Sequence, residues 1–223
     1  MDEVRIIEVK QSVFANNDKD ANELRKTLKQ KGTYLLNVMS SPGSGKTTTL
    51  VKLINLLKDE MKIAVLEADI DSDKDARTVA KETGVASIQL HTGGMCHLDA
   101  DMTRQGINEF KTDYDLLILE NVGNLVCPAE FDTGACKSIN ILSVPEGDDK
   151  PLKYPLMYEK CSVVLINKID VLPYFDFDLN KAKEYIAKRN RDAKVIEICA
   201  KDGRGIALFA DWLRKEVKNW KES

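Results

Sequence analysis

The sequence is poor in several residue types and patterns whose absence restricts its function. It contains two histidines and five cysteines among 223 residues, and no two cysteines have the Cys-x-x-Cys spacing. This spacing argues against a disulfide framework. In a cytosolic protein, isolated cysteines are usually core residues, metal ligands or reactive thiols. The sequence also lacks a His-rich tract and any internal repeat, so it offers no segment for metal storage.

Long runs of one kind are missing as well. No apolar run approaches the length of a transmembrane helix, and the first residues lack the basic and apolar parts of a signal peptide. The net charge is −3 and there is no long basic run, so nucleic-acid binding has no electrostatic support. We therefore expect a cytoplasmic protein that binds neither a membrane nor a nucleic acid.

What the sequence does have is the composition of one folded domain. Its hydrophobic content of 43% and charged content of 31% are ordinary, and its length fits a single α/β domain with a full core. Residues 1–31 contain a short strand-like piece, 4–9, and a polar helix, 18–31. Because this segment has too little apolar surface to fold alone, we expect an N-terminal extension at 1–31 packed on a main domain at 32–223.

The stretch 40–47, Ser-Ser-Pro-Gly-Ser-Gly-Lys-Thr, follows an apolar strand pattern at 34–39 and precedes a helical pattern at 48–58. Strand, glycine-rich loop and helix form the context of a Walker A phosphate-binding loop. Its lysine would reach the β- and γ-phosphates, and its threonine hydroxyl would bind Mg²⁺. The stretch begins with Ser where the general motif has Gly, and a serine-rich turn is the alternative interpretation. The predicted phosphate-binding residues are Gly43, Ser44, Gly45, Lys46, Thr47 and Thr48.

A second strand pattern, at 63–66, runs into an acidic segment. Its first aspartate, Asp69, lies close to the end of the strand, where doubly wound folds place ligand chemistry. Asp69 would hold Mg²⁺ or orient the attacking water. For the later acids a solvated loop is an equally good interpretation; these are Asp71, Asp73 and Asp75.

A hydrophobic strand pattern at 114–119 ends in Glu120, as in a Walker B motif. Ordinary GTPases have Asp-x-x-Gly at this point, and this chain has Glu-x-x-Gly. Glu120 would act on Mg²⁺ or on water, and the N–H of Gly123 would sense the γ-phosphate. The candidate catalytic residues are Lys46, Asp69 and Glu120, and the candidate Mg²⁺ ligands are Thr47, Asp69 and Glu120.

The tetrapeptide 167–170, Asn-Lys-Ile-Asp, follows a buried strand pattern at 162–166 and matches the Asn-Lys-x-Asp guanine signature. The carboxylate of Asp170 would accept from guanine N1–H and the exocyclic amine, a donor pair that adenine lacks. Lys168 would lie along the plane of the base. Asn167 would tie this loop to the Walker loop.

A further base-binding segment follows the last strand pattern. Residues Cys199, Ala200 and Lys201 match the Ser-Ala-Lys segment of GTPases, in which a backbone N–H binds guanine O6. Cysteine in place of serine alters the side-chain contact and leaves the backbone contact. A P-loop ATPase or small-molecule kinase is the alternative, although the guanine signature argues against it. Residues 32–223 are thus predicted to form a P-loop GTPase domain with a doubly wound, mainly parallel sheet flanked by helices.

The two histidines lie in one glycine-rich loop, 91–97, which places Cys96 next to His97. Adjacent cysteine and histidine suit a borderline metal such as Zn²⁺ or Ni²⁺. A buried cysteine beside a helix-capping histidine is the commoner explanation of such a pair. Cys127 lies four residues after Gly123, so a second thiol stands on a segment expected to move with the nucleotide state.

Four stretches, at 37–48, 91–97, 120–128 and 144–151, carry a resemblance to a known family. They are similar to the nickel-incorporation GTPases that mature nickel–iron hydrogenases, and the similarity extends from about Phe14 to the end of the chain. That family belongs to a P-loop class that works as nucleotide-dependent dimers. The resemblance accounts for Glu-x-x-Gly, and it implies a nickel or zinc site at the dimer interface made by Cys96, His97 and Cys127.

The resemblance further implies a slow GTPase that acts as a metallochaperone, with GTP, Mg²⁺ and Ni²⁺ or Zn²⁺ as its ligands, and assists nickel insertion into a nickel–iron hydrogenase. The expected partners are a second copy of the chain, in a GTP- and metal-dependent homodimer, and the hydrogenase large subunit or another nickel-delivery protein. Lys150 or Lys153, in a segment at 145–155 expected to be a mobile loop, would reach the partner's nucleotide or simply be solvated. A switch or metallochaperone for another metalloenzyme, urease or a cobalamin enzyme, is the alternative.

Overall fold

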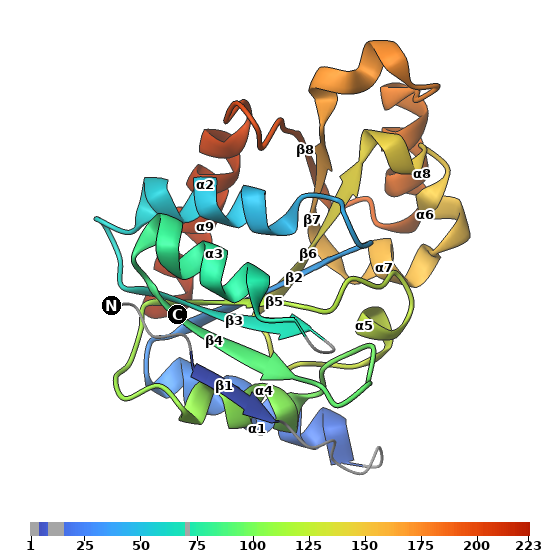
Figure 1. Cartoon of the computed structure of the whole chain (residues 1–223). Coiled ribbons are helices and arrows are strands. Elements are labelled where there is room, and N and C mark those ends of the chain that lie inside the picture. Colours follow the sequence, from blue (N-terminus) through green and yellow to red (C-terminus); the bar gives the residue numbers. More distant parts are fainter. Residues whose placement is uncertain (1–4, 9–15, 70–71) are drawn as a thin grey trace.

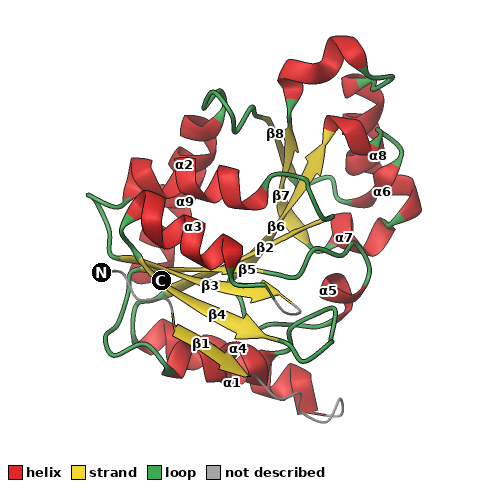
Figure 2. Ribbon diagram, viewed as in Figure 1, coloured by secondary structure: helices red, strands yellow, loops and turns green. Residues whose placement is uncertain are grey.

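The chain folds around one parallel β-sheet. The computed structural model describes residues 5–8, 16–69 and 72–223. These residues form an eight-stranded sheet of order β1-β4-β3-β5-β2-β6-β7-β8, in which each neighbouring pair is parallel. Helices cover both faces of the sheet, as Figures 1 and 2 show. The predicted doubly wound, mainly parallel α/β fold is therefore confirmed.

The strands coincide with the apolar runs of the sequence, because a parallel strand covered on both faces needs apolar side chains on both sides. The central strands β2 and β5 are buried along their whole length. Since the strands are parallel, their carboxyl ends meet at one edge of the sheet, where ligands bind in such folds. The strands are β1 Arg5–Glu8, β2 Tyr34–Ser40, β3 Ile63–Asp69, β4 Ala86–His91, β5 Leu116–Glu120, β6 Lys137–Ser143, β7 Cys161–Asn167 and β8 Lys194–Glu197.

Three apolar clusters hold the helices on the sheet. One joins α2, α3 and α9 to the face of the central strands, a second places α1 and α4 on the opposite face over β3, β4 and β5, and a third places α7 and α8 over β6 and β7 (Figure 1). The longer helices are α1 Asn17–Gln30, α2 Lys46–Leu57, α3 Lys74–Thr83, α4 Ala100–Asn108, α8 Leu179–Arg189 and α9 Ile206–Glu222.

The segment 145–155 differs from its prediction as a mobile loop. It contributes to three short helical pieces, η2 Val144–Glu146, α6 Lys150–Lys153 and α7 Pro155–Glu159. Its prolines stand in the first turn of these pieces, where no backbone donor is required and the fixed φ of proline suits a helix. The loop prediction was wrong because the prolines begin helices here instead of breaking them.

Some boundaries also differ from their predictions. Helix α4 begins at Ala100 because the carboxylate of Asp99 accepts from the N–H of Met102 and caps the helix. The strand predicted at 4–9 is represented by β1; its end residues, like Phe14 and Asp71, lie outside the described residues. Within the described ranges, no helix combines the length and the apolar character that crossing a membrane requires.

Candidate functional site

The predicted Walker loop connects β2 to α2 at the carboxyl edge of the sheet. Gly43 and Gly45 have φ angles of +72° and +98°, a region that residues with a side chain rarely adopt. A Cβ atom on Gly45 would also lie 2.6 Å from Nδ2 of Asn167. Helix α2 begins at Lys46, so its first N–H groups face the loop. The loop therefore has the curled backbone and helix N-terminus that bind phosphate.

The side chain of Lys46 lies across this loop, with Nζ 2.9 Å from Oγ of Ser40. Ser40 is the residue that stands in place of the motif's first glycine, and its side chain is buried. The general pattern has no hydroxyl at this position. Serine here therefore gives the lysine a local acceptor within the loop.

Asn167 connects the predicted guanine loop to the Walker loop. Its Nδ2 donates to the carbonyl oxygen of Ser44 at 2.8 Å. Its Oδ1 accepts from the N–H groups of Lys168, at 2.7 Å, and Ala200, at 3.1 Å. The predicted tie between the two loops is therefore confirmed, and the same buried amide also fixes the last loop.

A cavity of about 200 Å³ lies where these three loops meet. Lys168 closes one side, since its Nζ donates to the carbonyl oxygen of Gly43 at 2.7 Å and its backbone is left-handed, with φ of +63°. Asp170 is half-buried and lines the cavity. The lining residues are Gly45, Thr48, Asn167, Lys168, Asp170, Val171, Cys199, Ala200 and Lys201.

Glu120 lies at the end of β5, and its Oε1 accepts from the hydroxyl of Thr47 at 3.3 Å. Two of the three predicted Mg²⁺ ligands, Thr47 and Glu120, are thus neighbours. Directly across from Glu120, on β3, is Glu67, and both side chains are buried. Burial raises the pKa of Glu67 well above its ordinary range, and the adjacent Glu120 raises it further. Burial also raises the pKa of Glu120.

Glu67 was not predicted as a site residue. Its signal in the sequence is a single acid inside the apolar strand β3, a position where a charge is costly unless it has a purpose. Its role becomes visible only through the register of β3 and β5, which places it against Glu120. The structure therefore adds a second carboxyl group to the acidic side of the loop.

The remaining predicted residues of this edge are Asp69 and Gly123. Asp69 ends β3, and its Oδ1 accepts from the N–H of Ser72 at 2.9 Å. Gly123 packs closely on the Walker loop, because a Cβ atom there would lie 3.1 Å from the backbone N and Cα of Pro42. Of the later acids, Asp73 forms an ion pair with Arg77 at 2.7 Å on the surface of α3.

The two predicted lysines lie on α6. The Nζ of Lys153 pairs with Asp149 at 2.5 Å, and the Nζ of Lys150 lies 5.7 Å from the ring centre of Tyr154. Neither lysine lines the base cavity of its own chain.

The predicted metal ligands come from two separate segments. Sγ of Cys96, before α4, lies 2.9 Å from Sγ of Cys127, which begins the short helix α5 Cys127–Glu130. Both thiols are reduced, and the separation is longer than a disulfide bond. The hydrogen bond shared by the two thiols raises the pKa of Cys127. Two thiols this close together suit a soft or borderline metal ion.

His97 is adjacent to one of the two thiols in the sequence, and its side chain is buried. It does not form a three-ligand group with the two thiols. Among the residues that the structure describes, no three acidic, cysteine or histidine side chains converge as a metal site within one chain. Burial lowers the pKa of His97, which favours the neutral imidazole that binds metals. The donor set therefore fits a borderline metal, although one chain supplies too few converging ligands for a closed site.

Comparisons with known proteins agree with these observations. Residues 34–197 match the family model described as CobW/HypB/UreG, nucleotide-binding domain. The hydrogenase maturation factor HypB of Azotobacter chroococcum mcd 1 is 43% identical over 213 residues, which cover 95% of this chain and 70% of the relative. A hydrogenase/urease maturation factor HypB of Helicobacter pylori strain J99 is 38% identical, with coverage of 97% and 91%.

A solved structure gives the same result in three dimensions. The crystal structure of HypB from Helicobacter pylori in complex with nickel superposes with a TM-score of 0.86 at 40% identity, covering 92% of this chain and 96% of the other. The matched family model spans the Walker loop, the guanine loop and both thiols. The chain therefore belongs to the HypB family of hydrogenase maturation factors, within the CobW/HypB/UreG group of P-loop nucleotide-binding domains.

Proposed function

We propose that this chain is a GTP-binding and GTP-hydrolysing metallochaperone that assists nickel insertion into a nickel–iron hydrogenase. The proposal rests on the short stretch of chain that connects the nucleotide-binding site to the thiol pair. Gly123 packs against Pro42 of the Walker loop, and Cys127 lies four residues further along the chain, paired with Cys96. A change at the phosphates is therefore transmitted through one short segment to a thiol of the metal pair.

Guanine selectivity is supported by the cavity between the three loops. Asp170 lines it as an acceptor for the N1–H and exocyclic amine of guanine. The loop of Ala200 and Lys201 would face O6, and the N–H of Lys201 is the donor proposed for it, because the N–H of Ala200 already donates to Asn167. Adenine presents no matching pair of donors to a carboxylate. GTP is therefore the proposed nucleotide.

Hydrolysis follows from the groups around the Walker loop. Lys46 and the loop N–H groups bind the β- and γ-phosphates, and Thr47 with Asp69 or Glu120 would hold Mg²⁺, which neutralises phosphate charge when bound. The same carboxylates orient water in line with the γ-phosphate. None of the residues assigned here to the phosphates and Mg²⁺ is an arginine. Turnover is therefore expected to be slow, on the order of 10⁻² s⁻¹ or below, as in GTPases without an arginine finger supplied by a partner.

The metal site is completed by a second copy of the chain. One chain brings two thiols together, whereas a closed tetrahedral site needs four ligands. A two-fold axis would place four thiolates and two imidazoles at one interface, supplied by Cys96, Cys127 and His97 of each copy. The same axis would allow Lys150 or Lys153 to reach the partner's nucleotide. GTP and nickel thus favour the dimer, and hydrolysis loosens it and releases the cargo.

The test is GTP turnover measured together with nickel content and molecular size. We expect Mg²⁺-dependent hydrolysis that ATP does not compete with, and nickel bound only by chains that keep both thiols. Lys46→Ala removes the phosphate-binding cation and should abolish nucleotide binding while the protein stays folded. Normal hydrolysis by Lys46→Ala would contradict the assignment of the Walker loop.

One comparison favours a second metalloenzyme as a recipient of the nickel. The relative from Helicobacter pylori is a hydrogenase/urease maturation factor, so one family member serves two nickel enzymes. The same chemistry at this site would deliver nickel to a urease. Affinity purification of the tagged chain from its own cells, followed by identification of the bound metalloenzyme subunits, separates the two clients.

A further inference from the structure

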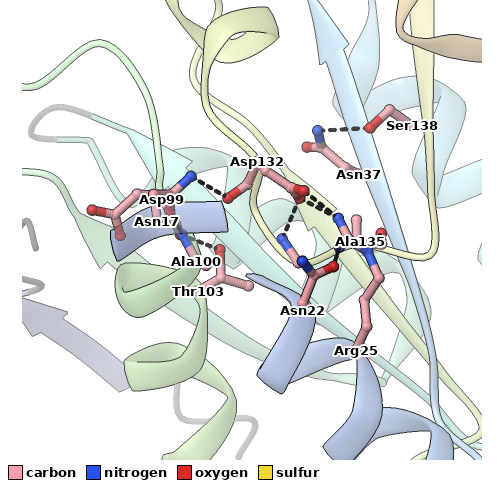
Figure 3. Close-up of polar contacts among 11 residues, drawn as sticks. Asn17, Asn22, Arg25, Asn37, Asp99, Ala100, Thr103, Asp132, Ala135 and Ser138 are labelled. Atoms are coloured by element: carbon pink, nitrogen blue, oxygen red, sulfur yellow. Dashed lines mark hydrogen bonds and ion pairs between the residues drawn. The ribbon is translucent and has the colours of Figure 1, made fainter. Parts of the chain in front are cut away.

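The first residue of α1, Asn17, makes hydrogen bonds to both segments that flank the candidate metal ligands. Its side chain is 8% exposed and lies between the start of α4 and the chain that follows α5 (Figure 3). Both halves of its amide are used, one as acceptor and one as donor. These two bonds connect segments that are more than 80 residues away from Asn17 in the sequence.

The acceptor half fixes the start of α4. Oδ1 of Asn17 accepts from the N–H of Ala100 at 2.9 Å. This N–H is one of the first donors of the helix, which have no partner inside the helix itself. Asp99 fixes the same turn by accepting from Met102. Ala100 lies three residues after His97, so the backbone that carries His97 leads into an anchored helix end.

The donor half fixes the segment after α5. Nδ2 of Asn17 donates to the carbonyl oxygen of Asp132 at 3.0 Å. Arg25, two turns further along α1, forms an ion pair with the carboxylate of Asp132 and donates to the carbonyl oxygen of Ala135 at 2.9 Å (Figure 3). Helix α1 thus contacts both the backbone and the side chain of Asp132.

The two anchored segments meet at His97. The ring of Phe131, next to Asp132, stacks on the imidazole with ring centres 3.6 Å apart and planes within 12°. Neither ring nitrogen of His97 has a hydrogen-bond partner among the described residues. Metal-binding histidines are usually oriented by a hydrogen bond to the second nitrogen. Here the orientation of the ring depends on stacking, and the stacking partner depends on the anchored segment.

We propose that Asn17 is a positioning residue for His97: by joining Ala100 to Asp132 it holds the buried imidazole against Phe131, with neither ring nitrogen engaged in a hydrogen bond to the described residues. The effect on metal affinity rests on the proposed function, whereas the effect on the ring does not. Helix α1 contributes to the metal site in this way without supplying a ligand.

The experiment exploits the fact that the chain contains two histidines. Metal-free protein with histidine labelled with ¹³C at ring Cε1 gives one ring signal from each histidine, and His91→Gln identifies which belongs to His97. A stacked aromatic ring shifts the ring-proton signals of His97 upfield. In Asn17→Ala, compared at the same pH, we expect the signal of His97 to move downfield and to broaden.

Two further variants isolate the cause. Asn17→Asp keeps the acceptor for Ala100 and loses the donor to Asp132, so it should reproduce the change if the tie to Asp132 is the important one. If the Asn17→Ala variant does not fold, the Asn17→Asp variant serves as the test in its place. Lys26→Ala, which changes an exposed residue on the same helix, is the control and should leave the signal in place.

Nickel affinity by competition with a chelator is the second readout. A lost orienting partner typically weakens metal binding by about 10-fold, and we expect that loss in Asn17→Ala with GTP binding retained. An unchanged His97 signal in folded Asn17→Ala overturns the proposal, as does full nickel affinity where wild-type binding requires His97. A shifted signal in a chain whose wild type binds no nickel supports the positioning role and refutes the proposed metal site.

Discussion

Glu67 on β3 and Glu120 on β5 lie opposite each other in adjacent parallel strands, with both carboxyl groups buried beside Thr47 of the Walker loop. Oε1 of Glu67 and Oε2 of Glu120 have no hydrogen-bond partner among the described residues. A proton on one of the two carboxyl groups would provide a hydrogen bond between the side chains. Two buried carboxylates on facing residues cannot both ionise easily, so the pair holds a proton more tightly than an ordinary carboxyl group does.

This pair predicts an unusual effect of Glu67→Gln on stability. Burial raises the pKa of Glu67 in the folded chain, so the folded state binds the proton more tightly than the unfolded state. Ionisation therefore costs stability as the pH rises above the ordinary carboxyl range, by about 1.4 kcal/mol for each unit of pKa shift. Glutamine stays neutral. We expect Glu67→Gln to raise the unfolding temperature of the nucleotide-free chain at about pH 8, with a benefit that disappears near pH 4.

Glu60→Gln supplies a comparison of opposite sign. A hydrogen bond from Arg214 lowers the pKa of Glu60 at the surface, so this carboxylate stabilises the fold above its unfolded pKa and loses that effect as the pH falls. Glu60→Gln should therefore lower stability slightly at about pH 8. Equal responses of the two variants across the pH range would mean that burial does not set the behaviour of Glu67.

Base selectivity depends on Asp170. Its carboxylate pairs with donors that only guanine offers, and a site built to pair with such donors rejects a base that lacks them, so GTP should exceed ATP by roughly 10⁴-fold in affinity. Asp170→Asn supplies an amide that donates a hydrogen bond, which should move the preference toward xanthine nucleotides. Competition binding with a fluorescent GTP analogue measures both. Comparable wild-type affinities for ATP and GTP would rule out the guanine assignment.

Two glycines of the Walker loop provide a matched pair of substitutions. Gly43→Ala and Gly45→Ala both introduce a side chain at positive φ, at a cost of roughly 1–2 kcal/mol each. Only the methyl group on Gly45 would meet another residue, the amide of Asn167 at 2.6 Å. Gly45→Ala should therefore weaken GTP binding well beyond Gly43→Ala, because it displaces the amide that joins the loops. Equal losses measured by titration calorimetry would argue against Asn167 as that joint.

Nickel affinity should rise with pH through the thiol pair. The hydrogen bond that Cys127 shares with Cys96 raises the pKa of Cys127, and a thiol must lose its proton to bind a metal. In the range below that raised pKa, affinity is expected to increase about tenfold per pH unit for each proton released. Cys127→Ser removes the thiol at nearly constant size and should flatten the dependence. A wild-type affinity that stays constant over this range would show that Cys127 is not a ligand.

The sequence identified the parts of the site that are encoded by local spacing. The Walker loop and the guanine loop both follow apolar strands, so residues 43–48 and 167–170 could be placed at strand ends without knowing the order of the strands. Glu67 could not be recognised in this way, because only the pairing of β3 with β5 brings it to Glu120. Asn17 was invisible for the same reason. Its partners are distant in sequence and are joined only when α1 packs beside α4.

The central claim is that nucleotide and nickel act on one shared interface between two copies of the chain. Its most direct test is molecular size by light scattering with a GTP analogue, GDP or no nucleotide, each with and without Ni²⁺. We predict a dimer with the GTP analogue and nickel together, a smaller dimeric fraction with GDP, and loss of the nickel effect in Cys127→Ala. A chain that remains monomeric in every condition, or a Cys127→Ala variant that retains full nickel binding, would contradict the account.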